Sequence, residues 1–300
     1  MKTQDEGYRS EDKWTFITEA LQKSLPVSPI MAIPNIVCKD RNEEGGMGIH
    51  FFKNALAGGD WIIQEVLHNS AFLQTMLPAT APLSTIRIVT GSSSSFAGPS
   101  EATPIKTFSC VFRAGRAGAA TDHDAILFDV DLTTGVIQEG SINREWYQLG
   151  LKNVSLANLR GPRAATRPNA KTAAAANPGT CTTGTGTGTG TSSTTNEEDA
   201  GGCRFTTHPD CGKQVTGITI PDIAKLKAIC VDAHSKSCAN VPLCGWDVAL
   251  TTEGVVLLEV NLSCNFFQAT VDHDSYFDFV DAHFKHLSQM CIPSAPSAEK

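Results

Sequence analysis

Long apolar runs are missing from this chain: none approaches the roughly 20 residues that a membrane-spanning helix needs. The polar residues 1–13 also lack the apolar core of a signal peptide. Basic residues form no continuous stripe of the kind that duplex nucleic acid requires, and the formal net charge is −7. We therefore expect a soluble, cytoplasmic protein that binds neither membranes nor nucleic acid. A small anionic ligand is still compatible, because a few cations and backbone amides suffice to bind one.

Close cysteine pairs are missing as well, since the ten cysteines include no CxxC motif. Structural zinc sites usually show such tight pairs, and cytoplasmic thiols stay reduced. We therefore interpret the cysteines as scattered buried or half-buried thiols. The alternative is a zinc site that combines some of the cysteines between positions 203 and 244 with His208.

Aromatic residues are absent from residues 163–202, which instead contain an alanine run and a Gly-Thr repeat. Such a segment cannot bury enough apolar surface to offset the entropy lost on ordering. We interpret it as a disordered insertion without catalytic chemistry, between two parts of one folded unit at 11–162 and 203–292. The chain as a whole is 41% hydrophobic over 300 residues, which is enough for a substantial core.

Apolar residues spaced by three and four predict amphipathic helices at residues 12–24, 221–234 and 275–290. Short runs rich in β-branched and aromatic residues predict strands at 33–38, 61–67, 84–90, 108–113, 125–132, 245–251 and 255–261. We expect the strand at 61–67 to be buried. Strands outnumber helices and follow one another in hairpin-like succession, so the predicted fold class is α+β with mainly antiparallel sheets.

The last predicted helix has apolar residues along one side, and we expect them to face the core: Phe277, Val280, Phe284 and Leu287. Its histidines are expected on the surface: His273, His283 and His286. Likewise, His123 is interpreted as an exposed loop residue and not as a catalytic base.

Two predicted strands in the C-terminal third carry polar residues at positions otherwise typical of a core. Asp247 lies in GWDVAL, while Glu259 and Asn261 lie in LLEVN. Residues two apart on a strand share a face, and a short turn at 252–254 would bring Asp247 beside Glu259. Carboxylate and amide oxygens are the ligands that Mg²⁺ prefers when it also binds phosphates. Two interpretations stay open: a metal site, or Asp247 at a turn with Glu259 at an exposed sheet edge.

The same two segments resemble the last two strands of the ATP-grasp ligases, above all the sugar-transfer-associated ATP-grasp group related to α-L-glutamate ligases. Further similar segments occur in the same order: DKWTF, CKDRNEEGGMGIHFF, WIIQEVLHNSAFLQTMLP, STIRIVT, VFRAGRAGAATD, VDLTTG and HPDCGKQVTGITIP. They cover most of the chain outside residues 163–202. The resemblance implies an ATP-grasp fold, in which two α+β lobes with mainly antiparallel sheets clasp ATP, with Mg²⁺ or Mn²⁺ as cofactor.

The resemblance also implies nucleotide-binding residues. Lys39 would contact the α- or β-phosphate, and a glycine loop would cover the triphosphate through Gly45, Gly46 and Gly48. The hinge between the lobes, where backbone groups read the adenine edge and an acid holds the ribose, would comprise Gln64, Glu65, Val66 and Leu67. Without the resemblance, the glycine segment favours an ordinary hairpin, and Gln64 and Glu65 favour solvent-facing positions.

Arg87 and Arg113 each lie in an otherwise apolar strand. A buried arginine needs an anionic partner. That partner is either a carboxylate of a neighbouring strand, in an internal ion pair, or a phosphate or carboxylate of the substrate. In the second case both arginines would be catalytic, because they would neutralise the phosphoryl group during its transfer.

The resemblance implies that Asp247, Glu259 and Asn261 bind the metal of an ATP-dependent ligase. Such an enzyme joins a small-molecule carboxylate to an amine or a thiol through an acyl-phosphate. The alternatives are an ATP-grasp phosphotransferase that phosphorylates a hydroxyl, and a nucleotide-binding relic without catalysis. His208–Pro209–Asp210 also matches the family, but the sequence assigns no role to these residues.

Overall fold

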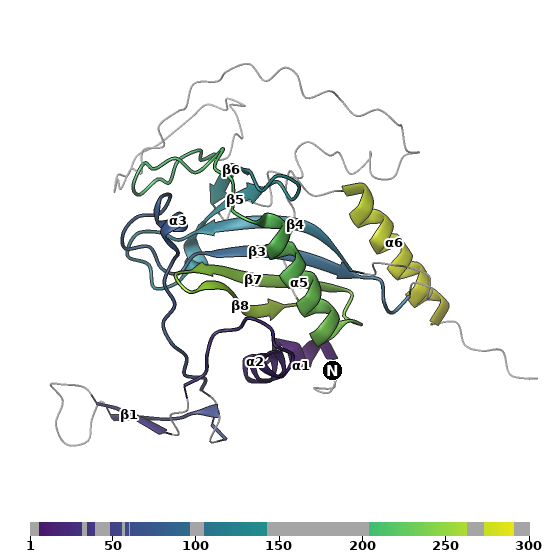
Figure 1. Cartoon of the computed structure of the whole chain (residues 1–300). Helices are drawn as coiled ribbons and strands as arrows, with labels where there is room; N and C mark the ends of the chain where they lie inside the picture. The colour runs from purple at the N-terminus through teal and green to yellow at the C-terminus, as the bar shows by residue number, and fades with distance from the viewer. Residues whose placement is uncertain are drawn as a thin grey trace, which may run out of the picture.

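The computed structural model describes residues 6–31, 35–39, 49–55, 58–59, 61–96, 105–142, 204–262 and 273–290. Its centre is a six-stranded antiparallel sheet with the order β6-β5-β4-β3-β7-β8 (Figure 1). The strands are β3 (Thr85–Ser92), β4 (Ile105–Ala114), β5 (Ile126–Val130), β6 (Ile137–Ile142), β7 (Leu243–Thr251) and β8 (Gly254–Asn261). The predicted α+β class with antiparallel sheets is confirmed, and the insertion predicted at 163–202 lies outside the described residues.

Three helices pack on one face of this sheet (Figure 1). The first two, α1 (Glu6–Glu11) and α2 (Lys13–Gln22), contact β8, and α5 (Ile223–Cys238) crosses β3, β4 and β7. Helix α2 begins after Asp12, whose side chain accepts a hydrogen bond from the Thr15 amide at 2.8 Å. The helices predicted at 12–24 and 221–234 are confirmed. Among the described helices, none combines the length and the apolar content of a membrane span.

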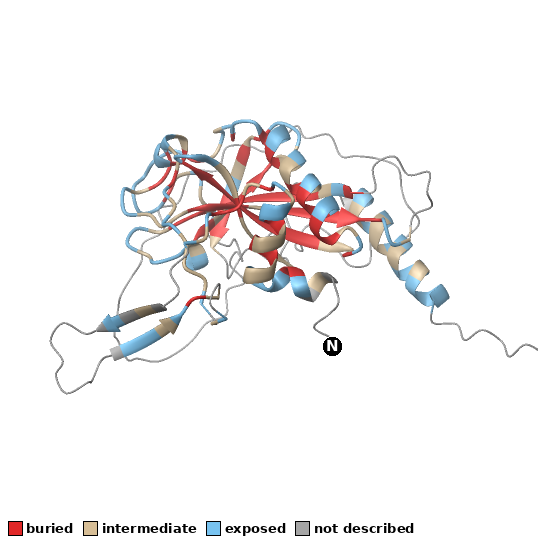
Figure 2. Ribbon diagram, turned by 60° about the horizontal axis from the view of Figure 1, so that its bottom comes forward, coloured by how far each residue is buried: buried red, intermediate tan, exposed pale blue. Residues whose placement is uncertain are grey.

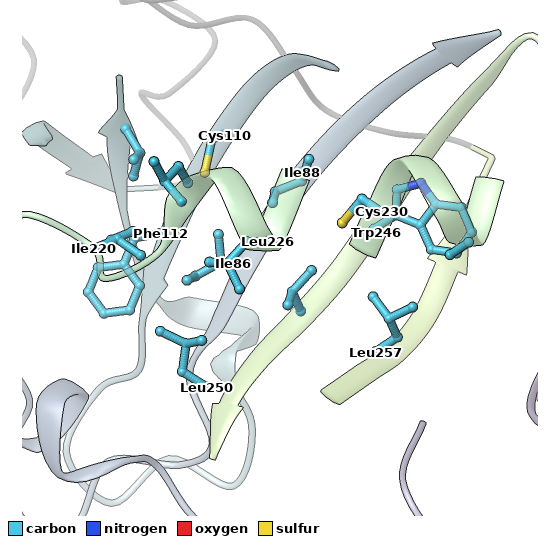
Figure 3. Close-up of a cluster of buried hydrophobic side chains, with 14 of the residues drawn as sticks. Ile86, Ile88, Cys110, Phe112, Ile220, Leu226, Cys230, Trp246, Leu250 and Leu257 are labelled. Carbon is cyan, nitrogen blue, oxygen red and sulfur yellow. The ribbon is translucent and has the colours of Figure 1, made fainter. Parts of the chain in front are cut away.

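The core lies between α5 and the sheet. Leu226 and Cys230 of α5 lie beside Ile86 and Ile88 of β3 and Trp246 of β7, all fully buried (Figure 3). Buried residues run along the central strands and the inner sides of the helices (Figure 2). Because successive side chains of a strand point to opposite faces, the residues between these core positions face away from the helices.

A separate two-stranded antiparallel sheet projects from the main body (Figure 1). It consists of β1 (Asn35–Lys39) and β2 (Ile49–Lys53). The strand predicted at 33–38 is therefore confirmed over its described part, 35–38. From the small sheet the chain returns to the main body through residues 61–67 and the short helix α3 (Ala71–Gln74), which begins after Ser70.

The prediction of a buried strand at 61–67 is wrong. Pairing along this segment consists of isolated bridges, Trp61 with Asn54 and Gln64 with Ile30. Trp61 is 55% exposed and Val66 is 76% exposed. The segment is apolar in sequence, but it passes between the two sheets as a connection. Because no neighbouring strand pairs along the whole segment, the side chains of Trp61 and Val66 face solvent.

For the last helix, α6 (His273–Met290), the prediction of which face points toward the core is also wrong. Phe284 is 65% exposed, and Phe277 and Leu287 are 37% and 40% exposed, while Val280 is half-buried. The neighbouring stripe of aromatic residues, one position earlier along the helix, contacts the body instead. Phe279 lies 5.3 Å from Phe108 and 5.7 Å from Phe96, measured between ring centroids.

Two of the histidines expected on the surface of α6 belong to this contacting stripe. The rings of His283 and His286 lie 5.4 Å and 6.1 Å from Phe96, and both residues are half-buried. The prediction was wrong for these two because their rings pack against Phe96, which follows the end of β3. The side chain of His273 lies outside the described part of the chain.

Candidate functional site

Charged residues form a row across three neighbouring strands on the face opposite α5. Its two carboxylates, Asp247 and Glu259, are called the acidic row below. Glu259 of β8 is the register partner of Asp247 in β7, and Asp247 is the partner of Arg87 in β3. The predicted proximity of Asp247 and Glu259 across the hairpin is confirmed. The turn predicted at 252–254 closes this hairpin, with Gly254 at a φ of 124°.

A register shift in β8 places Glu259 in this row. Val248 pairs with Leu257 while Asp247 pairs with Glu259, so Leu258 is an extra residue, as in a β-bulge. Leu257 and Val260 are both buried in the core, although strict alternation would put them on opposite faces. The bulge thus allows Glu259 to lie on the polar face between two core residues.

Both arginines predicted as catalytic bind Asp247. Arg87 donates to both carboxylate oxygens, with Nη2 3.0 Å from Oδ2, and Arg113 Nη1 lies 3.3 Å from the same Oδ2. The Asp247 side chain is only 6% exposed. These contacts agree with the interpretation that the arginines form internal ion pairs. Their action on a phosphoryl group stays a prediction.

A second carboxylate, which the sequence analysis did not select, holds Arg113 from the other side. Asp122 Oδ1 lies 3.0 Å from Arg113 Nη2, and the Thr85 hydroxyl donates to Oδ2 of Asp122. Asp122 begins the short 3-10 helix η2 (Asp122–Asp124), where His123 is exposed, as expected. Arg113 is therefore fixed between two carboxylates, so its guanidinium has a defined orientation.

Glu259 and Asn261 occupy the more accessible end of the row. The Asn261 Nδ2 donates to Glu259 Oε1 at 3.3 Å, and Lys13 Nζ lies 2.8 Å from Oε2. Burial acts to raise the pKa of Glu259, but the ammonium of Lys13 and the Asn261 amide outweigh it and hold the pKa below its usual value. Glu259 is therefore ionised at neutral pH.

Asp247 has the opposite tendency. Burial raises the pKa of its carboxyl above the usual value, and the negative charge of Glu259 acts in the same direction. Arg87 and Arg113 favour the ionised form and limit this rise. The row therefore holds one carboxyl whose pKa is lowered and a neighbour whose pKa is raised, a pattern typical of functional sites.

The donor atoms fit a hard divalent cation. Asp247, Glu259 and Asn261 supply two carboxylates and an amide oxygen from adjacent strands, which is the chemistry that Mg²⁺ and Mn²⁺ prefer. Lys13 now neutralises Glu259, and its side chain is 63% exposed, so it can move away at little cost. Asp247 is less free, because its oxygens already bind two arginines.

A pocket of about 870 Å³ is connected with this row through Lys13. Its described lining comes from the start of α2 and from the connection between the two sheets: Glu11, Asp12, Lys13, Trp14, Ala55, Gly58, Gly59, Trp61, Ile62 and Gln64. Lys13 both lines the pocket and binds Glu259, so it links the pocket to the acidic row. The volume is within the range of small-molecule sites, which is about 300–1,000 Å³.

The structure separates the residues predicted for the hinge. Gln64 lines the pocket, and its Nε2 donates to the Ser28 carbonyl at 3.1 Å. Glu65 and Val66 are exposed and Leu67 is half-buried, and none of the three belongs to the described lining. Lys39 ends β1, but its side chain lies outside the described residues, as does the loop with Gly45, Gly46 and Gly48.

Lys13 is a site residue that sequence reasoning missed. Its position could have indicated its role. Lys13 is the first residue of α2, where the helix dipole disfavours a cation. The ion pair with Glu259 offsets that cost. A lysine at this position indicates a local anion, either the glutamate itself or a ligand beside it.

His208–Pro209–Asp210, for which the sequence assigned no role, fastens a loop to the sheet. Asp210 accepts from Arg116 Nε at 2.8 Å and Nη2 at 2.6 Å, and from the Ala117 amide at 2.8 Å. The buried His208 ring lies 3.1 Å from the Gly115 carbonyl through Nε2. Burial lowers the pKa of His208, so the ring is neutral. These contacts fix the connection that follows Arg113.

The comparisons with known proteins agree with this geometry. Residues 154–273 match the family model described as sugar-transfer associated ATP-grasp, and this range contains β7 and β8 with the acidic row. Curated proteins give no match. An ATP-grasp domain implies ATP-dependent ligase-type activity, and the family typically uses ATP and Mg²⁺. Over residues 154–273 the chain is thus similar to the sugar-transfer associated ATP-grasp family, the group that its strand motifs resemble.

Proposed function

We propose that this protein is an ATP- and Mg²⁺-dependent ligase that joins a carboxylate to an amine or a thiol through an acyl-phosphate. One observation supports this proposal above the others. A row of ion-paired residues, Arg87–Asp247–Glu259, ends at Lys13, which also lines a pocket of nucleotide size. A triphosphate that extends from this pocket would meet cations and metal-binding oxygens together.

The nucleotide base fits the part of the pocket formed by the sheet connection. Trp14 and Trp61 line the pocket, and the indole of Trp61 is more than half exposed. A purine gains free energy by stacking on such a ring, because both faces are apolar and polarisable. The backbone at Gln64, the one residue of the hinge implied by the resemblance that belongs to the described lining, would then read the adenine edge.

The phosphates of the nucleotide fit the part of the pocket that Lys13 lines. When the nucleotide binds, the ammonium of Lys13 leaves Glu259 and binds a phosphate oxygen in its place. The released Glu259, together with Asn261 and Asp247, would hold Mg²⁺. The metal ion supplies charge neutralisation at the β- and γ-phosphates.

Arg87 and Arg113 contribute orientation and positive charge. Both guanidiniums are held by carboxylates before substrate arrives, so they need no reorganisation when charge develops on the phosphoryl group. A carboxylate oxygen of the substrate attacks the γ-phosphorus, the bond to ADP breaks, and an acyl-phosphate forms. An amine or thiol then attacks the acyl carbon, loses a proton, and releases inorganic phosphate.

Release of ADP in the presence of candidate carboxylates and amines tests the proposal. We expect Glu259→Gln to lower the rate at least about 100-fold, because the neutral amide weakens metal binding. Glu253→Gln is the matched control, since Glu253 lies exposed in the turn of the same hairpin. Equal rates for wild type and Glu259→Gln would reject the proposal. A stable phosphorylated product formed without an amine or thiol would instead indicate a phosphotransferase.

One observation favours the non-catalytic alternative. Lys13, Arg87 and Arg113 already neutralise Glu259 and Asp247. A relic would retain these ion pairs for stability alone. It would release no ADP with any carboxylate and amine, and Glu259→Gln would change only its stability.

A further inference from the structure

A cluster of side chains that could bind a metal lies on the helix side of the sheet, on the face opposite the acidic row. His234 and Cys238 are one helical turn apart near the end of α5, and Cys244 is the second residue of β7. All three are completely buried. Their ligand atoms lie within 4.8 Å of one another, and this is the one such group of three found among the described residues.

The distances between these atoms match the edges of a tetrahedral zinc site. Cys238 Sγ lies 3.6 Å from Cys244 Sγ, and Cys244 Sγ lies 3.7 Å from His234 Nε2. Zinc binds thiolate at about 2.3 Å and imidazole at about 2.0–2.1 Å, which gives tetrahedral edges of about 3.8 Å between sulfurs and about 3.6 Å between sulfur and nitrogen. Both observed distances agree with these edges to within about 0.2 Å.

The hydrogen bonds around His234 permit the tautomer that a metal requires. Thr90 Oγ1 lies 2.7 Å from Nδ1, accepts from Trp246 Nε1 at 2.8 Å, and lies 3.5 Å from the Cys244 carbonyl. If Nδ1–H donates to Thr90, the Thr90 hydroxyl can donate to that carbonyl, and Nε2 then donates no hydrogen to the Val241 carbonyl 2.9 Å away. The Nε2 lone pair is then free, with its ring held by a second residue, as in most metal-bound histidines.

The fourth position has a candidate ligand. The Val241 carbonyl oxygen lies 2.9 Å from His234 Nε2, on the loop between α5 and β7. In the tautomer with hydrogen on Nε2 this oxygen accepts a hydrogen bond. In the other tautomer the two atoms are close enough to share a metal ion after a small shift, since oxygen and nitrogen ligands of a tetrahedral ion lie roughly 3.3 Å apart.

The net charge of the site suits an apolar interior. Two cysteine thiolates cancel the charge of Zn²⁺, so the occupied site is neutral, and the two thiol protons leave when the metal binds. Oxygen-binding cations such as Mg²⁺ prefer harder ligands than thiolate. The donor set therefore selects a soft metal ion and separates this cluster chemically from the acidic row.

We infer that His234, Cys238 and Cys244 form a buried structural zinc site that fastens the end of α5 to β7. The site would fix the loop at 239–242 and the first residues of β7, three positions before Asp247. Because the three side chains are buried, the metal enters while the chain folds. The inference does not depend on the nucleotide chemistry proposed above.

Metal analysis of the purified full-length chain tests the inference. We expect one zinc ion per chain after extensive dialysis, retained in Cys230→Ser and lost in Cys238→Ser and Cys244→Ser. Cys230 is the matched control, because it is a fully buried cysteine two turns earlier in the same helix. Zinc in equal amount in all four proteins, or in none, would overturn the inference.

A second measurement on the wild-type chain keeps the test decisive if the serine variants fail to fold. Refolding with Co²⁺ in place of zinc should give the visible bands of a tetrahedral ion and a near-ultraviolet thiolate charge-transfer band. Their absence would contradict the site. So would a Cys238–Cys244 disulfide, detected as resistance of both thiols to alkylation until a reductant is added.

Discussion

At the scale of single residues, Asp247 connects structure and proposed function. Its carboxylate lies between two guanidiniums in an environment that excludes most water. Removing one member of a buried ion pair is costly because the remaining charge stays buried without compensation. The same arrangement fixes both arginines for a phosphate. Stability and the proposed catalysis would therefore both depend on this one side chain.

Replacing Asp247 by asparagine should lower the free energy of unfolding by about 3 kcal/mol, because Arg87 and Arg113 lose their shared counter-charge. Urea unfolding at neutral pH measures this change. Asp232→Asn is the control, since Asp232 forms an exposed pair with Lys236 and its loss should cost less than about 1 kcal/mol. Equal effects of the two substitutions would show that the Asp247 cluster contributes no more than a surface pair.

The sequence predicted these residues better than their partners. Asp247, Glu259 and Asn261 stood out as polar positions in apolar strands, and their proximity followed from strand geometry. Lys13 did not stand out because its contact joins segments far apart in the chain, and Asp122 did not because its contacts with Arg113 and Thr85 depend on how β3, β4 and η2 pack. The bulge at Leu258 was also missed, since LLEV alone fits a regular strand.

At the scale of elements, five strands of the main sheet, all but β6, and the two helices at 13–22 and 223–238 were predictable from local sequence patterns. The errors have one physical cause. In residues 61–67 and in α6, apolar residues suggested a buried face that the tertiary structure does not cover. Local pattern shows which side of an element is apolar, but packing decides which side is buried.

The corrected orientation of α6 gives a direct comparison. Phe279→Ala removes the ring that contacts Phe96 and Phe108, and should cost about 1–3 kcal/mol of stability. Phe284→Ala removes an exposed ring and should change stability by less than about 0.5 kcal/mol. Hydrogen exchange of α6 amides reports the docking separately. Faster exchange in Phe284→Ala than in Phe279→Ala would reverse the assigned orientation.

The loop at 204–220 should depend on pH through Asp210. Its hydrogen bonds with Arg116 lower its pKa, so the folded state binds a proton less readily than the unfolded state. The resulting stabilisation is complete above the unfolded pKa of about 3.9 and is lost as pH falls through the lower folded value. Asp210→Asn should therefore be less stable than wild type by about 1–3 kcal/mol at pH 7, and the difference should shrink below about pH 4.

Urea unfolding of both proteins over this pH range measures the difference. A gap between wild type and Asp210→Asn that stays constant below pH 4 would exclude the carboxylate–guanidinium contact as its cause. Glu139→Gln serves as a control, because its pair with Arg204 is exposed on both sides. Its stability difference from wild type should be small throughout.

At the scale of the whole molecule, the two proposed sites lie on opposite faces of the sheet. One face carries the acidic row beside the pocket, and the other carries the helices with the His234–Cys238–Cys244 cluster. β7 contributes to both, through Asp247 on one side and Cys244 near its start. The family match over residues 154–273 includes this strand, whereas Lys13, Arg87 and Arg113 precede the matched range.

Calorimetric titration of ATP, with and without Mg²⁺, tests the central claim most directly. Wild type and Glu253→Gln should bind ATP more tightly when Mg²⁺ is present, while Glu259→Gln should lose at least about tenfold in affinity and most of the Mg²⁺ effect. If wild type binds no ATP, or if Glu259→Gln binds MgATP as wild type does, the acidic row is not a metal–nucleotide site.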